Sequence, residues 1–403
     1  LTSLTSNTGG TLSLGADVSV AGAVDVNDAV TLTGAVSLTT TSGGTIDFAS
    51  TLDGAQDLTL ASAGATVFNG AVGATTPLGD GTGSALAINS TGATSFESDL
   101  RTASGITQGG SAGTATFKGD VTTLAGNLAT TLDGNVILDG LTFTGGGNLT
   151  FGSAGSDTLT ISTANVTVKT PSKTLTIPSN VTINDGLSLT LGAGGATVVS
   201  VTGAIAGKSG GTVDSDLVVN TTGAASFTGA IGGGNQFRNL TVTQSGGTTF
   251  DGAVTSTGGT VLLTDTTGAI EFNGALVAPT LTASGGGYAL NLDGGSTITN
   301  AVNLTNTGAV RIGDASGDVN TFTGGLTGTA PGSLSLAGTI ASTNTAISLG
   351  DLGGSATAST LTADTVLSAG SGTLTLGGTV DGAFGLTVNS TGTVALNGIV
   401  GGT

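Results

Sequence analysis

The side chains that could do chemistry in this 403-residue chain are almost all carboxylates and hydroxyls. The sequence has no His and no Cys, and its 25 Asp and Glu outnumber its 7 Lys and Arg. Without imidazole or thiol there is no Ser-His-Asp or Cys-His nucleophile, and the usual zinc ligands are missing. Two carboxylates would suffice for glycoside hydrolysis, but the basic residues are scattered and no acidic cluster recurs beside them. We therefore expect no enzymatic activity and no required cofactor.

One acidic segment has the spacing of a calcium-binding loop. Asp314, Ser316, Asp318 and Asn320 place oxygen-bearing side chains at alternate positions, as an EF-type loop does. The segment lacks the Gly at the sixth position and the Glu at the twelfth that such a loop uses. These four residues are the candidate calcium ligands, and a solvated acidic turn is the alternative interpretation.

The charge balance bears on the partners of the chain. The formal net charge is −18, and only 8% of residues are charged, where roughly 25% is usual. Neutralising phosphates requires clustered Lys and Arg, so we expect no nucleic-acid binding. No apolar run approaches the roughly 20 residues of a membrane-spanning helix, so we expect no membrane insertion.

The composition favours strands over helices. Thr, Val and Ile lose side-chain rotamers in a helix, and Gly, with 74 copies, costs backbone entropy there. Thr, Val and Ile suit the pleated surface of a sheet. The sequence therefore predicts an all-β protein.

A short phrase recurs along the whole chain in the form Gly-small-x-x-Φ-x-Gly, where Φ is a large apolar residue. We expect the Φ side chains to point inward and to stack from one repeat to the next. Leu14 opens the series, and Leu336, Leu376 and Leu396 close it. About 19 repeats with a mean length of about 21 residues are typical of a solenoid. The aromatic members of the expected core stack are Phe48, Phe68, Phe96, Phe117, Phe227, Phe250 and Phe272.

Each repeat also has an internal pattern of strands and corners. In the last one, residues 386–388 and 393–396 alternate like strands, and Asn-Gly pairs separate such runs. Asn and Gly tolerate positive φ, which is why such pairs are common in turns. Three short strands and three corners per repeat predict a parallel β-helix, or β-solenoid.

The regular spacing is interrupted in three places. Inserted residues lie near 75–84, 203–216 and 314–326. No linker or change of composition separates the repeats, so we predict one continuous solenoid over residues 1–403. Both ends stop within ordinary repeats, whereas a solenoid that stands alone usually carries capping units. Either the chain is a slice of a longer polypeptide or its copies stack end to end, and we expect the second.

The repeats resemble those of large secreted bacterial adhesins and exoproteins of the filamentous-haemagglutinin-like and autotransporter types. The resemblance rests on motifs such as VNTTGAASFTGAIGG (219–233) and VNSTGTVALNGIVGG (388–402). It implies a β-solenoid exported from a bacterium, found outside the cell or on its surface. It also implies a role in a stalk, a surface fibre or a biofilm matrix.

Two functions are consistent with these observations. The first is a structural subunit or stalk of an extracellular fibre, with other copies of the same chain as its partners. The alternative is an adhesive module that binds a cell-surface glycan or a host receptor, with calcium as a candidate stabilising ion. Such a module needs a local break in the repeat, and the inserts near 75–84 and 314–326 are the candidates.

Overall fold

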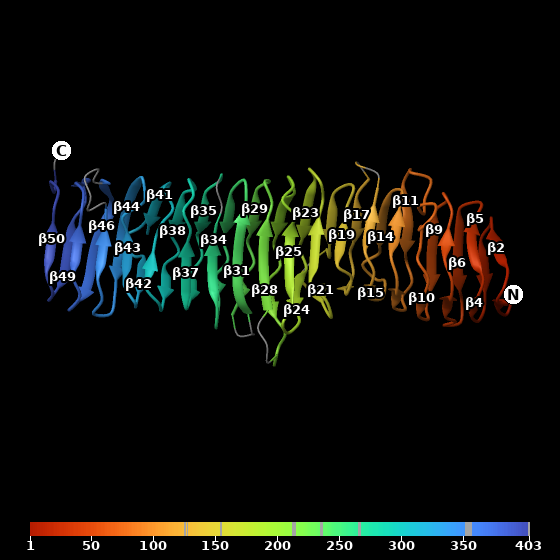
Figure 1. Cartoon of the computed structure of the whole chain (residues 1–403). Helices are drawn as coiled ribbons and strands as arrows, with labels where there is room; N and C mark the ends of the chain where they lie inside the picture. The colour runs from red at the N-terminus through yellow and green to blue at the C-terminus, as the bar shows by residue number, and fades with distance from the viewer. Residues whose placement is uncertain are drawn as a thin grey trace. The chain divides into compact units, whose positions relative to one another are not determined.

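The computed structural model describes residues 1–124, 126, 128–153, 155–211, 215–233, 237–264, 267–350 and 357–401. They form two compact units, Leu1–Ala204 and Ile205–Thr403, which are described one at a time (Figure 1). Both are parallel β-solenoids with about 17 turns in total and no helix among the described residues. The predicted fold class is confirmed, and the turn count is near the 19 expected. The single continuous solenoid stays a prediction.

The turns of the first unit contribute strands to three columns of parallel pairs. In the third column, Val72 alone bridges Leu52 and Leu100. The first column contains β1 (Leu4–Ser6), β4 (Val24–Val26), β7 (Ile46–Phe48), β10 (Thr66–Phe68), β12 (Thr94–Phe96), β15 (Ala115–Phe117), β18 (Val136–Leu138), β21 (Thr158–Ile161) and β24 (Asn180–Ile183). The second contains β3 (Val18–Val20), β6 (Val36–Thr40), β9 (Leu58–Ser62), β11 (Ser84–Ile88), β14 (Gly105–Gln108), β17 (Thr130–Leu132), β20 (Leu149–Phe151), β23 (Thr174–Ile177) and β26 (Val198–Val201). The third contains β2 (Thr11–Leu14), β5 (Ala29–Leu32), β8 (Leu52–Asp53), β13 (Leu100–Thr102), β16 (Val121–Thr123), β19 (Thr142–Thr144), β22 (Val166–Lys169) and β25 (Ser188–Gly192).

The second unit has the same three-column plan, except that two long strands each pass through two columns. The first column contains β29 (Ala225–Phe227), β32 (Thr248–Phe250), β35 (Ile270–Phe272), β38 (Leu290–Leu292), β41 (Ala309–Ile312), β44 (Ser333–Ala341), β46 (Ser359–Gly370) and β48 (Val380–Asp381). The second contains β27 (Ile205–Gly207), β30 (Ile231–Gly232), β33 (Val254–Thr255), β36 (Leu276–Ala278), β39 (Ser296–Ile298), β42 (Val319–Phe322), the later parts of β44 and β46, and β49 (Leu386–Ser390). The third contains β28 (Ser215–Asn220), β31 (Phe237–Gln244), β34 (Thr260–Leu263), β37 (Thr280–Ala283), β40 (Val302–Asn303), β43 (Leu326–Gly328), β45 (Ile347–Leu349), β47 (Leu374–Leu376) and β50 (Val394–Leu396).

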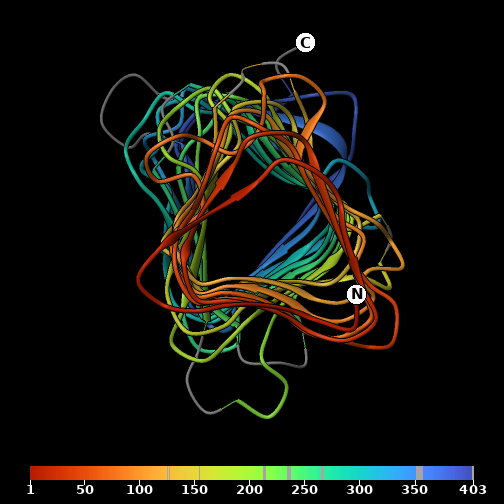
Figure 2. The same cartoon turned by 90° about the vertical axis from the view of Figure 1, so that its right-hand side faces the viewer.

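Alternation along each short strand decides what the solenoid buries. In Figure 2 the backbone of the turns traces three sides around a central space, which apolar side chains fill. Because successive residues of a strand point to opposite faces, the middle residue of most three-residue strands faces outward, whereas in β19 it is Phe143 that is buried. The strand Thr-Thr-Phe of β32 shows this pattern, with the first and third residues buried and the second half-buried.

Phenylalanine rings form two stacks in the interior. In the first unit, the ring centroids of Phe48, Phe68, Phe96 and Phe117 follow one another at 4.9, 4.8 and 5.3 Å with nearly parallel planes. In the second unit, Phe250 lies 5.1 Å from Phe227 and 4.8 Å from Phe272. All seven rings are almost fully buried.

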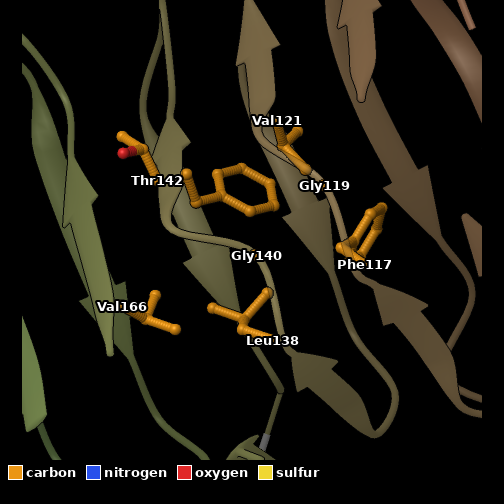
Figure 3. Close-up of a pocket in the computed structure, with 8 residues that line it drawn as sticks. Phe117, Gly119, Val121, Leu138, Gly140, Thr142 and Val166 are labelled. Atoms are coloured by element: carbon orange, nitrogen blue, oxygen red, sulfur yellow. The ribbon is translucent and has the colours of Figure 1, made fainter. Parts of the chain in front are cut away.

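The stack of the first unit changes direction at Phe117. The ring of Phe143 meets that of Phe117 edge-on, with centroids 5.7 Å apart. Figure 3 shows Phe117, Val121, Leu138 and Val166 directed into the same space between successive turns. This space has no room for a water molecule, so the core here is dry and packed.

The Ser/Thr-x-Gly part of the repeated phrase has a structural cause. The hydroxyl of Ser62 accepts a hydrogen bond from the N–H of Gly64, at 3.1 Å. It also lies within hydrogen-bond distance of the carbonyl of Gly44 in the preceding turn, at 2.8 Å. Ser390 makes the equivalent two bonds. One hydroxyl thus closes a corner and ties it to the turn below.

The corner glycines that follow Asn or Asp are of two kinds, and only some of them, such as Gly54 and Gly186, have the positive φ that we expected. Gly70 and Gly274 lie outside the left-handed region. A Cβ at Gly274 would lie 2.5 Å from the carbonyl carbon of Gly252 in the turn below, and one at Gly70 would lie 2.4 Å from that of Ser50. These corners need Gly because stacked backbones approach closely, which leaves no space for a side chain.

The expected series of inward Φ residues mixes two columns. Leu336 continues the column of Phe272, through Ile312, and the next member is Leu361. Leu376 and Leu396 lie in the third column, where they pair with each other. Leu14 is likewise in the third column of the first unit. The expectation that these three leucines share the phenylalanine position was wrong, because every side of a turn has a similar Gly and apolar pattern.

Among the described residues, no helix is long and apolar enough to cross a membrane.

Candidate functional site

A run of polar and charged side chains follows successive turns of the second unit along one edge of its first column. We call it the Arg311 ladder; it comprises Asp251, Glu271, Asn273, Asn291, Asp293, Arg311 and Asp314. The middle residues of β35 and β38 and the third residue of β41 face outward in register, so Glu271, Asn291 and Arg311 lie one above the other. The other members follow the inward residue at the end of each strand.

Hydrogen bonds between turns connect the Arg311 ladder. The side-chain amide of Asn273 donates to Asp251 at 2.8 Å, and that of Asn291 donates to Glu271 at 3.2 Å. The guanidinium of Arg311 donates from Nε to Asp293 Oδ1 at 2.7 Å. A second, closer bond joins Arg311 Nη2 to Asp293 Oδ2. Such a two-pronged pair is geometrically specific.

The Asp293 carboxylate is the most enclosed charge of the Arg311 ladder. Its side chain is 7% exposed, whereas that of Arg311 is 37% exposed. The hydrogen bond to Asp293 raises the pKa of Arg311. Both oxygens of Asp293 are bonded to Arg311, which lies one turn away. The pair therefore fastens two turns together.

Asp314 is in a different electrostatic environment. Although Asp314 is exposed, partial loss of its hydration raises its pKa, and the negative charges of Asp293 and Asp318 raise it further, with Arg311 acting in the opposite direction. A carboxyl group among other carboxylates is a site to which a cation or a hydrogen-bond donor would be attracted.

The four candidate calcium ligands do not all face one point. Asp318 Oδ2 accepts hydrogen bonds from the backbone N–H groups of Asp314 and Ala315, both at 2.8 Å, so it closes its own turn. Asp314 and Ser316 are exposed. Calcium at this turn stays a prediction.

Asn320, the fourth candidate, has its side chain in the interior. It is 0% exposed, and Ser296 Oγ donates to its Oδ1 at 2.6 Å. Its Nδ2 has no hydrogen-bond partner. In the described part of the chain, no three Asp or Glu side chains are grouped so that they could hold a metal ion.

The insert near 75–84 is packed against the solenoid. Leu78 is 0% exposed, and Asp53 accepts hydrogen bonds from the N–H groups of Thr75 and Thr76 at 2.8 and 3.0 Å. The insert is therefore fastened both by its apolar side chain and by its backbone.

The other two inserts lie near 203–216 and 314–326. Residues 212–214 of the insert near 203–216 lie outside the described residues. The insert near 314–326 includes an exposed turn and then enters β42, whose residues are alternately exposed and buried.

Sequence reasoning missed three ion pairs between neighbouring turns. They join Lys118 to Glu97 at 2.6 Å and Arg238 to Asp216 at 3.1 Å, and Arg311 to Asp293. The partners are separated by 21, 22 and 18 residues, about one repeat length. A search for opposite charges one repeat apart would have found them.

A second feature is the apolar surface of the last described turn of the second unit, formed by Val394, Leu396 and Val400. We call it the terminal face. Val394 and Leu396 pair in register with Leu374 and Leu376, which are at most 1% exposed, whereas the exposed fractions of Val394 and Leu396 are 42% and 43%. The terminal face thus presents side chains that every earlier turn buries.

Comparison of the chain with protein-family models, with curated proteins and with solved structures finds no match.

Proposed function

We propose that this chain is a structural β-solenoid of an extracellular bacterial stalk, surface fibre or matrix filament, and that its copies associate end to end. The observation that carries the proposal is the register of the stacked turns, in which Val394 and Leu396 repeat the positions of the buried Leu374 and Leu376. Burying apolar surface contributes about 25 cal/mol per Å². A further turn stacked in the same register would remove this surface from water.

A second copy is the occupant that fits the terminal face. The first turn of the chain, β1 and β2, has half-buried Leu4 and Leu12, alternating with exposed residues. Stacked on the terminal face, it would repeat the parallel pairing that already joins neighbouring turns. Such a head-to-tail contact extends into a filament when its rotation does not close into a ring. The unpaired N–H and C=O groups at the edge of a sheet favour the same pairing.

The uses of the polar side chains support a structural role. The hydroxyl of Ser62 and the carboxylate of Asp293 both bond to neighbouring turns. The acid excess, with a net charge of −18, keeps the sides of separate copies apart. Association is then directed to the ends.

The test compares two variants of one strand by sedimentation over a range of protein concentrations. In β50, Val394 and Leu396 belong to the terminal face, whereas Ala395 lies in register with the outward-facing Thr375. We expect the double change Val394→Asp and Leu396→Asp to abolish concentration-dependent assembly, and Ala395→Asp to preserve it. Equal assembly of the two variants, or no assembly of the unchanged chain, would refute end-to-end association.

Adhesion to a glycan is a second candidate, and the Arg311 ladder favours it. The ladder presents both carboxylates and an amide: the exposed carboxylates belong to Asp251 and Asp314, and the amide between them belongs to Asn291. Both kinds of group could form hydrogen bonds with sugar hydroxyls. The change Asp314→Asn should weaken binding in a glycan screen, and Asp28→Asn in the first unit should not. If the first variant binds as well as the unchanged chain, the ladder is not the adhesive site.

A further inference from the structure

Three Asn-Gly pairs occupy corners of the solenoid: Asn69-Gly70, Asn273-Gly274 and Asn397-Gly398. Each Asn follows the inward apolar residue that ends a strand. Asn followed by Gly can deamidate without an enzyme, because the next backbone nitrogen reaches the side-chain carbonyl carbon and Gly offers no side chain to obstruct it. The reaction requires a mobile Asn side chain and an available Gly nitrogen.

The structure restrains both groups at Asn273. Its side-chain amide donates to Asp251 at 2.8 Å, and the N–H of Gly274 donates to the carbonyl of Phe250 at 3.1 Å. Both acceptors belong to the turn below. Deamidation of Asn273 therefore requires a local opening that breaks two hydrogen bonds, one of them to a charged acceptor.

Asn69 is restrained at its side chain. The Asn69 amide donates to Asp47 at 2.9 Å and to the carbonyl of Phe48 at 3.4 Å. The N–H of Gly70 makes no hydrogen bond within the described residues. Asn69 thus lacks one of the two restraints that hold the Asn273-Gly274 pair.

Asn397 has neither restraint. The register of β47 and β50 places Thr375 and Gly377 in the turn below it, where the other two Asn residues find a carboxylate. Asn397 is exposed, and over the described chain neither its side chain nor the N–H of Gly398 makes a hydrogen bond. The difference arises from the residues of the turn below.

We propose that Asn397 is a site of spontaneous deamidation and that the turns below Asn69 and Asn273 protect those two residues. The Gly398 nitrogen attacks the side-chain carbonyl carbon of Asn397, a C–N bond forms, and the side-chain nitrogen leaves as ammonia with the proton from Gly398. Water then opens the resulting succinimide at either carbonyl, which gives Asp or isoaspartate.

The product would regulate assembly, and this consequence rests on the proposed function. Asn397 directly follows Leu396 of the terminal face. Deamidation adds a negative charge there, and isoaspartate adds a methylene to the backbone, which shifts the register of any turn stacked above. Deamidation at this corner would thus weaken the stacking of that turn.

Peptide mass spectrometry of the folded chain, incubated at neutral pH, tests the site. We expect the order Asn397, then Asn69, then Asn273, with Asn397 at least about tenfold faster than Asn273, a factor that corresponds to about 1.4 kcal/mol. In the variant Asp251→Ala, deamidation of Asn273 should accelerate while that of Asn397 stays unchanged. Equal rates at Asn397 and Asn273 in the unchanged chain would overturn the proposal.

Protein concentration separates this inference from the proposed function. If copies stack on the terminal face, Asn397 should deamidate more slowly at concentrations where the chain assembles, and deamidated chains should be depleted from the assemblies. A fast rate at Asn397 that is the same at every concentration would support the deamidation site and count against end-to-end association.

Discussion

Replacing Phe250 with Ala tests the stacked core. Phe250 is 0% exposed and lies between Phe227 and Phe272, with ring centroids at 5.1 and 4.8 Å. A buried Phe→Ala change costs about 3–5 kcal/mol, and a stacked aromatic pair contributes about 0.5–1.5 kcal/mol beyond burial. Because two such pairs are lost, we expect a cost in the upper part of that range, near 5 kcal/mol.

Phe384 provides the matched control, since it is 48% exposed. Phe384→Ala should cost less than about 1 kcal/mol, because little buried surface is lost. Urea denaturation followed by circular dichroism gives the free energy of unfolding of both variants. Since each repeat contacts mainly its neighbours, hydrogen exchange should quicken in β29 and β35 and stay unchanged in distant turns. Equal destabilisation by the two changes would refute the account of the core.

Three further predictions concern the corners and charges. Ser62→Ala should cost about 1–3 kcal/mol in urea denaturation, because it leaves buried backbone groups without their bonds; a neutral effect would contradict the role of this hydroxyl. Gly274→Ala should cost about 1–3 kcal/mol, because the added Cβ would meet the backbone of the turn below. Gly317→Ala should not destabilise the chain, because no atom lies within 4 Å of the added Cβ. Equal effects of the two changes would count against close stacking of the backbones. The hydrogen bond from Lys118 lowers the pKa of Glu97 below its ordinary 4.5. The stabilisation that this pair gives the folded chain is therefore complete above pH 4.5, and it is lost as the pH falls through the lowered pKa of Glu97 in the folded chain. For this surface pair the loss should be under about 1 kcal/mol and should vanish in Lys118→Ala, as pH-dependent urea denaturation would show.

The repeated phrase made the architecture predictable from the sequence. Phe227, Phe250 and Phe272 recur at nearly one repeat length, and a chain that buries one such side chain per turn must place them in register. What the phrase does not encode is the side of the turn on which an apolar residue lies. Leu376 and Leu396 carry the same local pattern but belong to the third column.

Contacts between turns limited the prediction of the candidate site. Asn320 has the spacing of a ligand, yet strand alternation turns its side chain into the core, where it bonds to Ser296. Conversely, Asp293 and Arg311 stand in no recognisable motif, and their pairing depends on the register of adjacent turns. Local spacing predicts which residues share a strand, whereas the repeat length predicts which residues meet across turns.

Electron microscopy of the purified, unmodified chain tests the central claim most directly. If the terminal face binds a second copy, thin filaments that lengthen with protein concentration should appear, and Val394→Asp with Leu396→Asp should leave only single particles. Single particles of the unmodified chain at every concentration would contradict end-to-end association.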